Sequence, residues 1–267
     1  MYKTLVLSGG GVRGFAHLGA LQLLQEKNIL DTVEHYLACS VGSIISFLII
    51  IGYRPNNLYE FLKMININKM QSFDFNNILN NFGIDNGHLI MDMLESCLEV
   101  KMNVKNITFK QLHEISKKKL TVCATCINTR SETYFSHDTH PDLDVLLAIR
   151  MSISIPFLFT PIKYDNCYYI DGAVINNYPI DKVDTSSVLG IAIINKHNII
   201  NINHYDEYIM ECINCFLDTA FIRNIDLFKK NTIKIVCPSY NMIEDLDVNL
   251  KDSLYQLGYN TAKDYLG

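Results

Sequence analysis

Ser40 is the residue of this chain whose type and surroundings most directly indicate nucleophilic chemistry. It follows an apolar run and lies at the centre of the motif Ala38-Cys39-Ser40-Val41-Gly42. The motif matches the nucleophile-elbow pattern G-x-S-x-G, except that Ala38 replaces the first glycine. Small residues two positions before and after the serine let a helix begin close to the preceding strand and leave Oγ exposed. A serine at the start of a helix is also a common N-cap, so the motif alone allows a purely structural role.

A serine nucleophile needs a base, and Asp171 is the best candidate in the sequence. It ends the apolar run Tyr168-Tyr169-Ile170 and is followed by Gly172 and Ala173, which leave room around the carboxylate. A partly desolvated aspartate has a raised pKa and can take a proton directly. Asp-Gly is, however, also a common turn. No histidine stands out as the base: His17 lies on an expected helix, His35 begins an expected strand, and His137 and His140 lie in a polar loop.

A glycine-rich loop, Gly9-Gly10-Gly11-Val12-Arg13-Gly14, lies between an expected strand and an expected helix. It fits G-x-G-x-x-G, the fingerprint of dinucleotide-binding loops, in the context that this fingerprint requires. The acidic residue at the right distance, Glu34, stands at the start of the second strand rather than at its end, which argues against a dinucleotide site. Alternatively, backbone N–H groups at the start of the helix bind an anion, such as the oxyanion formed when a carbonyl is attacked.

Short apolar runs alternate with helical patterns around these motifs. Residues 3–8 and 33–38 are expected strands, residues 15–25 an expected helix, and a second, apolar helix follows Gly42. This βαβα order predicts a largely parallel sheet covered by helices. Further strands are expected at 121–127, 132–135, 168–170, 188–194 and 233–236, helices at 144–151 and 250–265, and a helix-rich stretch at 56–119. No internal repeat or linker interrupts the chain, so residues 1–267 are expected to form a single domain.

Composition limits the possible classes of function. The 267 residues are 49% hydrophobic and 19% charged, which excludes a disordered or fibrous protein, and the net charge of −5 gives no reason for nucleic-acid binding. Residues 35–53 are uncharged but divide into a strand, a turn and a short helix, so no transmembrane segment is expected. The N-terminus has no signal-peptide pattern and the eight cysteines lie in apolar stretches, which favours a reduced, intracellular protein.

Two C-x-x-C pairs, Cys123/Cys126 and Cys212/Cys215, are candidate metal ligands. A zinc site needs four ligands in tetrahedral reach, whereas residues three apart on a strand, such as Cys123 and Cys126, face opposite sides. We therefore expect the cysteines to be small buried hydrophobic residues and expect no metal site.

Four blocks, in this order, resemble the patatin-like phospholipases, a family of lipid acyl hydrolases with a Ser–Asp dyad. The first two are the glycine loop at residues 9–14 and the serine motif at residues 38–42. The third is Arg150-Met151-Ser152-Ile153-Ser154-Ile155-Pro156 with Phe159-Thr160-Pro161, and the fourth is Asp171-Gly172-Ala173 with Asn177-Tyr178-Pro179. The resemblance covers residues 3–195 and departs from the family pattern at Ala38.

The resemblance implies a three-layer α/β/α domain in which Ser40 attacks an acyl carbonyl while Asp171 accepts its proton. The glycine loop, residues Gly9 to Gly14, would form the oxyanion hole, and Arg13 would place a lipid phosphate or brace the loop. The donors to the oxyanion would be the backbone N–H groups of Gly10, Gly11 and Val12.

The implied reaction is hydrolysis of fatty acyl esters of phospholipids, without a metal or a cofactor. The protein would act as a cytoplasmic, peripheral enzyme at membrane surfaces. One alternative is a catalytically silent lipid-binding relative, which the substitution at Ala38 favours. A less well supported alternative is a dinucleotide-binding oxidoreductase.

Overall fold

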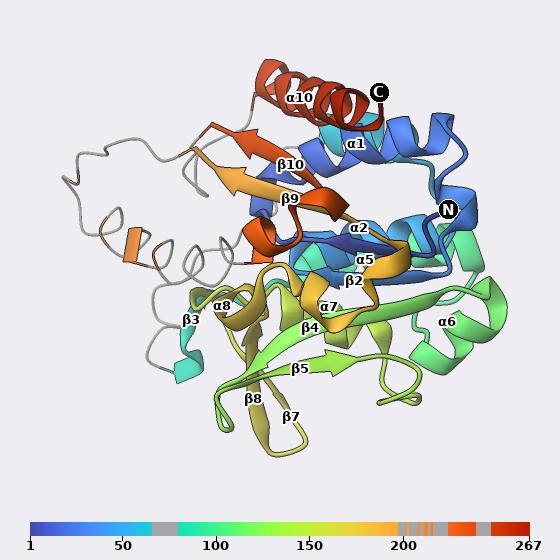
Figure 1. The fold of residues 1–267 in the computed structure, drawn as a ribbon. Helices are drawn as coiled ribbons and strands as arrows, with labels where there is room; N and C mark the ends of the chain where they lie inside the picture. The colour runs from blue at the N-terminus through green and yellow to red at the C-terminus, as the bar shows by residue number, and fades with distance from the viewer. Residues whose placement is uncertain are drawn as a thin grey trace.

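A mixed β-sheet forms the centre of the computed structural model (Figure 1). The structure describes residues 1–65, 80–196, 224–238 and 247–267, together with residues 202, 208, 211, 212 and 215. Within these residues the strand order is β10-β9-β1-β2-β4-β8-β7, and β5 pairs with β4. The strands are β1 (Thr4–Leu7), β2 (His35–Cys39), β4 (Lys119–Cys126), β5 (Ser131–Phe135), β7 (Ile162–Tyr164), β8 (Cys167–Asp171), β9 (Val188–Asn195) and β10 (Thr232–Cys237). Two short strands, β3 (Gly83–Asp85) and β6 (Phe157–Phe159), form a separate pair.

Strands β10, β9, β1, β2 and β4 run parallel, as the alternation of strands and helices predicts. Their carboxyl ends therefore lie at one edge of the sheet, where β2 leads into Ser40. Strand β8 runs antiparallel to β4, and its last residue, Asp171, pairs with Ala124. The preceding residue of β4, Cys123, pairs with Cys39. An antiparallel strand thus brings its end beside the carboxyl end of β2.

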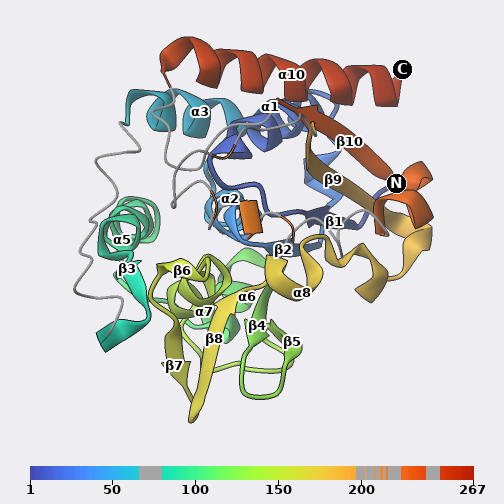
Figure 2. The ribbon, with the colours of Figure 1, turned by 90° about the vertical axis from the view of Figure 1, so that its left-hand side faces the viewer.

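Helices cover both faces of the sheet. They are α1 (Gly14–Glu26), α2 (Val41–Ile50), α3 (Pro55–Met64), α5 (His88–Met102), α6 (Phe109–Ser116), α7 (Val145–Ser152), α8 (Ala173–Asn176) and α10 (Val248–Leu266). Helices α1, α2 and α7 form a thick layer on one face, and Figure 2 shows the short α8 on the other. Side chains of β1 alternate between the two faces of the sheet. Leu5 and Leu7 pack in the core with residues of α1 and α2, whereas Val6 packs on the other face with Tyr178 and Ile180.

This architecture confirms the predicted α/β fold with a central, largely parallel sheet between helical layers. The uncharged segment 35–53 forms β2 and the ten-residue helix α2, and none of the described helices is long and apolar enough to cross a membrane. At the C-terminal end of the chain, β10 pairs with β9 and α10 packs along α1. The ring of Tyr255 on α10 stacks on Tyr59 of α3, with 4.0 Å between the centroids.

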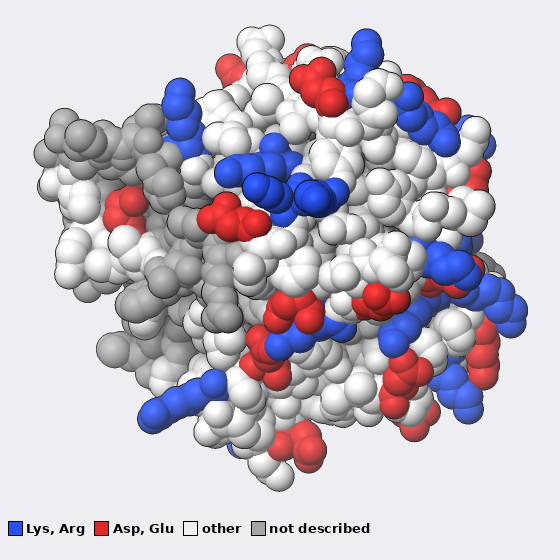
Figure 3. All heavy atoms as spheres, viewed as in Figure 1, with Lys and Arg blue, Asp and Glu red and all other residues white. Residues whose placement is uncertain are grey.

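Charged side chains of both signs are interspersed on the face of the molecule seen in Figure 3. Several form ion pairs, among them Lys182 with Glu132, and Lys3 with Glu34 at 3.2 Å. Exposed pairs of this kind contribute little to stability, so the apolar core on both faces of the sheet stabilises the fold.

Candidate active site

Ser40 occupies the tight turn between β2 and α2. Its backbone has φ 51° and ψ −130°, a combination that is rare and strained for a residue other than glycine. Although Ser40 stands at the N-cap position of α2, its side chain caps no amide of that helix. Its Oγ instead donates a hydrogen bond to Oδ2 of Asp171 at 2.7 Å. The turn therefore presents the hydroxyl to a carboxylate, and the interpretation of Ser40 as an ordinary N-cap is wrong.

Two neighbours hold the Ser40 turn in this conformation. A Cβ atom added to Gly42 would lie 2.7 Å from the carbonyl oxygen of Ser8, so only glycine lets α2 begin against the end of β1. Oγ of Ser152 accepts the N–H of Ser40 at 2.8 Å and donates to the carbonyl oxygen of Cys123 at 2.6 Å. Gly42, two residues after the serine, therefore lets the helix begin close to the strand, as the motif predicts. Ser152 also holds the backbone of the turn through the N–H of Ser40.

Asp171 lies at the end of β8 and is 1% exposed. Its Oδ1 accepts the N–H of Ala173 at 2.8 Å, so the carboxylate shapes the Asp-Gly turn and meets Ser40 at the same time. The Sγ of Cys39 lies 3.9 Å from the same Oδ1. Burial raises the pKa of Asp171 from 3.8 to about 7, although the hydrogen bonds from Ala173, Ser40 and Cys39 oppose this shift. Asp171 therefore has the proton affinity of a general base near neutral pH.

The glycine loop is fixed to the segment that follows Asp171. The N–H of Gly9 donates to both the side-chain Oδ1 of Asn177, at 2.9 Å, and its backbone oxygen, at 3.2 Å. A Cβ atom added to Gly9 would lie 2.3 Å from that Oδ1 and 3.1 Å from Cβ of Ser40. The absence of a side chain at Gly9 thus lets the loop approach Ser40 closely, while its N–H is engaged by Asn177.

Arg13 braces the same loop from within. Its Nε donates to the carbonyl oxygen of Gly10 at 3.0 Å and its backbone N–H donates to the same oxygen at 3.1 Å. The N–H of Gly14 donates to Gly11. Three successive amides of the loop donate to no described residue: those of Gly10, Gly11 and Val12. These are the amides expected to face an oxyanion. Arg13 is 8% exposed, and its two hydrogen bonds to Gly10 hold the start of the loop.

The acidic residue that a dinucleotide site would need lies at the wrong edge of the sheet. Glu34 precedes β2, and its carboxylate pairs with Lys3 at 3.2 Å where β1 begins. The glycine loop lies at the opposite edge, where β1 ends. The carboxylate of Glu34 therefore cannot bind a ribose held at that loop.

Among the described residues, no histidine hydrogen-bonds to Ser40 or Asp171. His17 of α1 is fully buried, and its Nε2 lies 2.9 Å from the carbonyl oxygen of Ser8. Burial lowers the pKa of His17 to about 4, so the ring is neutral at pH 7 and Nε2 donates to that oxygen. His17 thus supports the residue that precedes the glycine loop and is not positioned as a base for Ser40.

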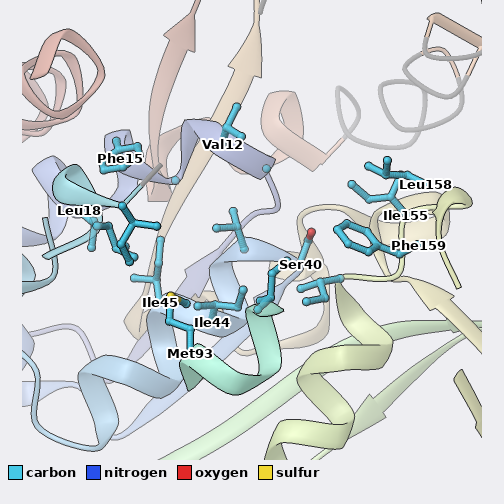
Figure 4. Close-up of a pocket in the computed structure, with 17 residues that line it drawn as sticks. Val12, Phe15, Leu18, Ser40, Ile44, Ile45, Met93, Ile155, Leu158 and Phe159 are labelled. Atoms are coloured by element: carbon cyan, nitrogen blue, oxygen red, sulfur yellow. The ribbon is translucent and has the colours of Figure 1, made fainter. Parts of the chain in front are cut away.

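A cavity of about 200 Å³ opens beside Ser40 (Figure 4). Phe15 and Leu18 of α1, Ile44 and Ile45 of α2 and Met93 of α5 line it on one side of Ser40, and Ile155, Leu158 and Phe159 on the other. Of the described residues that line it, Ser40 alone has a polar side chain. Such a surface offers a fatty acyl chain contact along its length and no competing hydrogen bond.

The sequence motifs assign no role to three residues that position the site: Asn177, Ser152 and His17. Each is a buried polar side chain. His17 lies on the apolar helix α1, and Ser152 and Asn177 lie in the two blocks at residues 150–161 and 171–179 that carry the family resemblance. Buried polar groups are almost always hydrogen-bonded, so their presence in such stretches was the available signal. The sequence alone does not identify their partners, since Gly9 and Asn177 are 168 residues apart.

A family model described as patatin-like phospholipase matches residues 5–184 of the chain. The "Probable lipid hydrolase 463L" of Invertebrate iridescent virus 6 is 41% identical over 186 residues, which cover 67% of this chain and 62% of the viral protein. The "Uncharacterized protein R571" of Acanthamoeba polyphaga mimivirus is 29% identical over 279 residues, which cover 98% of this chain and 92% of that protein.

Among solved structures, VipD from Legionella pneumophila matches with a TM-score of 0.68 at 16% sequence identity. The match covers 99% of this chain and 66% of VipD. The chain therefore spans less than two thirds of the length of VipD and of the lipid hydrolase of the iridescent virus. At this identity the likeness to VipD concerns the fold alone.

Proposed function

Because the chain belongs to the patatin-like phospholipase family, we propose that it hydrolyses fatty acyl esters of phospholipids, a phospholipase A-type reaction. Ser40 is the nucleophile and Asp171 the base. The observation that carries the proposal is the 2.7 Å hydrogen bond from Ser40 Oγ to Asp171 Oδ2, with Ser40 in the wall of an apolar cavity. The lipid hydrolase named among the relatives supports the substrate class.

In the first half of the reaction, Oγ of Ser40 attacks the ester carbonyl while Asp171 accepts its proton. Asp171 then gives that proton to the departing alcohol, which leaves an acyl-enzyme. In the second half, Asp171 takes a proton from water while the water oxygen attacks the acyl carbonyl. When the ester bond to Ser40 breaks and the fatty acid leaves, Asp171 returns that proton to Oγ of Ser40. A pKa raised to about 7 suits both directions of transfer, because a base works best when its pKa is near the working pH.

The oxyanion of each tetrahedral intermediate is bound by the amides of Gly10, Gly11 and Val12. The close approach of Gly9 to Ser40 supports this assignment, since the loop then begins next to the reacting oxygen. Preorganised backbone donors of this kind act without reorganisation during the reaction. The mechanism needs no Lewis acid, so excess EDTA should leave hydrolysis unchanged.

The acyl chain of the substrate occupies the apolar cavity, and the enzyme meets its substrate at a membrane surface. The absence of polar side chains other than Ser40 among the described lining residues supports an acyl chain over a polar ligand. The pairing of β10 with β9 and the packing of α10 on α1 support the proposal that residues 1–267 form one patatin-like domain.

A fluorophosphonate probe tests the nucleophile, and lipid analysis of mixed liposomes tests the reaction. We expect the probe to label Ser40 and the liposomes to lose fatty acid from phospholipid. Ser46→Ala is the matched control, because Ser46 is a buried serine on the same helix and lies outside the proposed machinery. A folded protein whose Ser40 stays unlabelled and that releases no fatty acid would instead be a silent lipid-binding relative.

A further inference from the structure

Two exposed phenylalanines, Phe82 and Phe157, have left-handed backbone conformations, with φ of 63° and 67°. Their exposed fractions are 57% and 63%. A bulky side chain at positive φ is a rare and strained arrangement, and water around an exposed aromatic ring adds a further free-energy cost. A protein that keeps both features at two adjacent places has a use for the rings at its surface.

The two rings belong to one small platform. Phe82 directly precedes β3, and Phe157 is the first residue of β6; the strands run parallel with Gly83 opposite Phe157. The N–H of Thr160, just after β6, donates to the carbonyl oxygen of Asp85 at 2.8 Å. The backbone of Phe82 is thus one residue away from the position that pairs with Phe157, so the two phenylalanines start the two strands side by side.

A buried arginine makes this platform rigid. Arg150 of α7 is 4% exposed, and its Nη2 donates to the carbonyl oxygens of Asn86, at 2.9 Å, and Thr160, at 3.0 Å. Its Nη1 donates to Oγ of Ser154 at 2.6 Å. One guanidinium thus joins the ends of both short strands to α7, so the exposed rings are held by a fixed support.

The platform continues into the cavity beside Ser40. Leu158 and Phe159, the two residues that follow Phe157 on β6, line that cavity and lie on one side of Ser40 in Figure 4. A surface that contacts lipid through Phe157 would therefore bring the bilayer next to the cavity wall that Leu158 and Phe159 form.

The surroundings of Phe82 have the character of a membrane interface. The ring of Tyr168 meets Phe82 edge-to-face with 6.2 Å between centroids, and Nζ of Lys163 lies 5.9 Å from the centroid of Tyr168. At a membrane surface, apolar rings such as Phe82 contact the acyl chains, and tyrosines such as Tyr168 lie at the interface. Flexible cations such as Lys163 contact the headgroups.

We propose that Phe82 and Phe157 insert into the lipid surface and anchor the protein with its cavity facing the bilayer. This inference rests on the proposed function, because the continuity with the cavity identifies lipid as the occupant. The net charge of −5 gives no general attraction to anionic lipid, so the anchor works mainly by burial of the two rings.

Vesicle sedimentation tests the anchor independently of turnover. The Ser40→Ala protein is mixed with vesicles of phosphatidylcholine, pure or with a minority of phosphatidylserine, at low and high salt. The variants Phe82→Asn and Phe157→Asn are chosen because asparagine tolerates positive φ, so the fold should keep or gain thermal stability. Ile115→Asn, on α6 and 64% exposed, is the control of matched exposure.

We expect the double variant to lose at least about tenfold in vesicle partitioning, with Ile115→Asn unchanged and little dependence on salt. When the double variant is made in protein that retains Ser40, it should hydrolyse a short, soluble ester at the normal rate and phospholipid vesicles slowly. Unchanged vesicle binding of a folded double variant would overturn the proposal, and so would self-association through the two rings in the absence of lipid. If the protein binds vesicles as expected but has no esterase activity, the proposed function is refuted and the membrane anchor is not.

Discussion

Where the parallel strands of the sheet end, Ser40 and Asp171 lie buried beside an apolar cavity; where they begin, histidines and ion pairs lie near the surface. At this second edge, the rings of His113 and His137 stack with 3.8 Å between centroids. Asp138 accepts a hydrogen bond from Lys119 at 2.5 Å. Both edges gather titratable groups, and within the described residues the first combines them with the proposed nucleophile Ser40 and the apolar cavity.

The two aspartates show how the surroundings decide the chemistry. Burial raises the pKa of Asp171 to about 7, whereas the hydrogen bond from Lys119 lowers the pKa of Asp138 below its usual value. Asp171 can therefore exchange a proton near neutral pH, and Asp138 stays ionised. A cluster of ionisable residues thus indicates a catalytic site only where burial shifts a base toward the working pH and a nucleophile contacts it.

Ser40→Ala should have the largest effect on activity, because it removes the nucleophile that distinguishes the edge with Asp171 from the edge with Asp138. We expect kcat/KM for a phospholipid to fall by at least about 10³-fold, because the nucleophile is lost while the buried turn is kept. Turnover is measured by fatty acid release, with Ser46→Ala and Asp138→Asn as controls that stay near wild type. Activity of a few per cent in a folded Ser40→Ala protein would contradict the assignment.

The pH dependence of kcat/KM distinguishes the two aspartates. Only ionised Asp171 accepts a proton, so the rate should rise about tenfold per pH unit up to a plateau that begins near its pKa of about 7. An initial-rate profile on a soluble ester measures this limb. An inflection in the range of an ordinary carboxylate, below about pH 5, would mean that the base is not buried Asp171.

Ser152→Ala tests whether the strained turn needs its tether. The substitution leaves the N–H of Ser40 without its acceptor, so we expect kcat to fall by about tenfold and the protein to lose about 1–3 kcal/mol of stability. Steady-state kinetics and thermal unfolding give the two quantities. Wild-type kinetics with unchanged stability would show that the turn is held by other contacts.

Replacing each aspartate by asparagine should change stability in opposite directions. The pKa of Asp171 is higher in the folded protein than in the unfolded chain, so stability falls as pH rises from about 4 to about 7. Asp171→Asn should therefore raise Tm by a few degrees above pH 7 and give no gain near pH 4. The pKa of Asp138 is lowered, so Asp138→Asn should lower Tm slightly above pH 4, by little because the pair is exposed.

Calorimetry of both variants across this pH range measures the two effects. A lower Tm for Asp171→Asn in mild alkali would contradict the account of a destabilising buried charge. A large loss for Asp138→Asn would mean that the ion pairs at the opposite edge stabilise the fold more than exposed pairs usually do.

The sequence predicted the elements and motifs of the site because their signals are local. Apolar runs next to glycines identified β1, β2 and the loop, and the serine motif fixed the position of the turn before α2. The antiparallel direction of β8 was not predicted, because pairing between strands depends on contacts between distant segments. For the same reason the partners of Asn177 and Ser152 could not be identified.

The positive φ values of Phe82 and Phe157 were also not predicted. Phenylalanine favours extended strands. Asn80, Asn81 and Gly83 around Phe82 indicate a turn, but they do not indicate that the phenylalanine itself takes the left-handed conformation. Both residues lie at the start of the β3–β6 pair, whose ends Arg150 holds through Asn86 and Thr160. Tertiary contacts therefore override local preference at these two positions.

A paired comparison of Asp171→Asn with variants of every histidine shows whether Ser40 is activated by an aspartate alone. The histidines are replaced singly by alanine, with circular dichroism to confirm folding: His17, His35, His88, His113, His137, His140, His197 and His204. If Asp171 is the base, kcat/KM falls by at least about 10²-fold for Asp171→Asn and no folded histidine variant is inactive. A folded histidine variant as inactive as Ser40→Ala, beside an active Asp171→Asn, would contradict the dyad and replace it with a histidine-dependent triad.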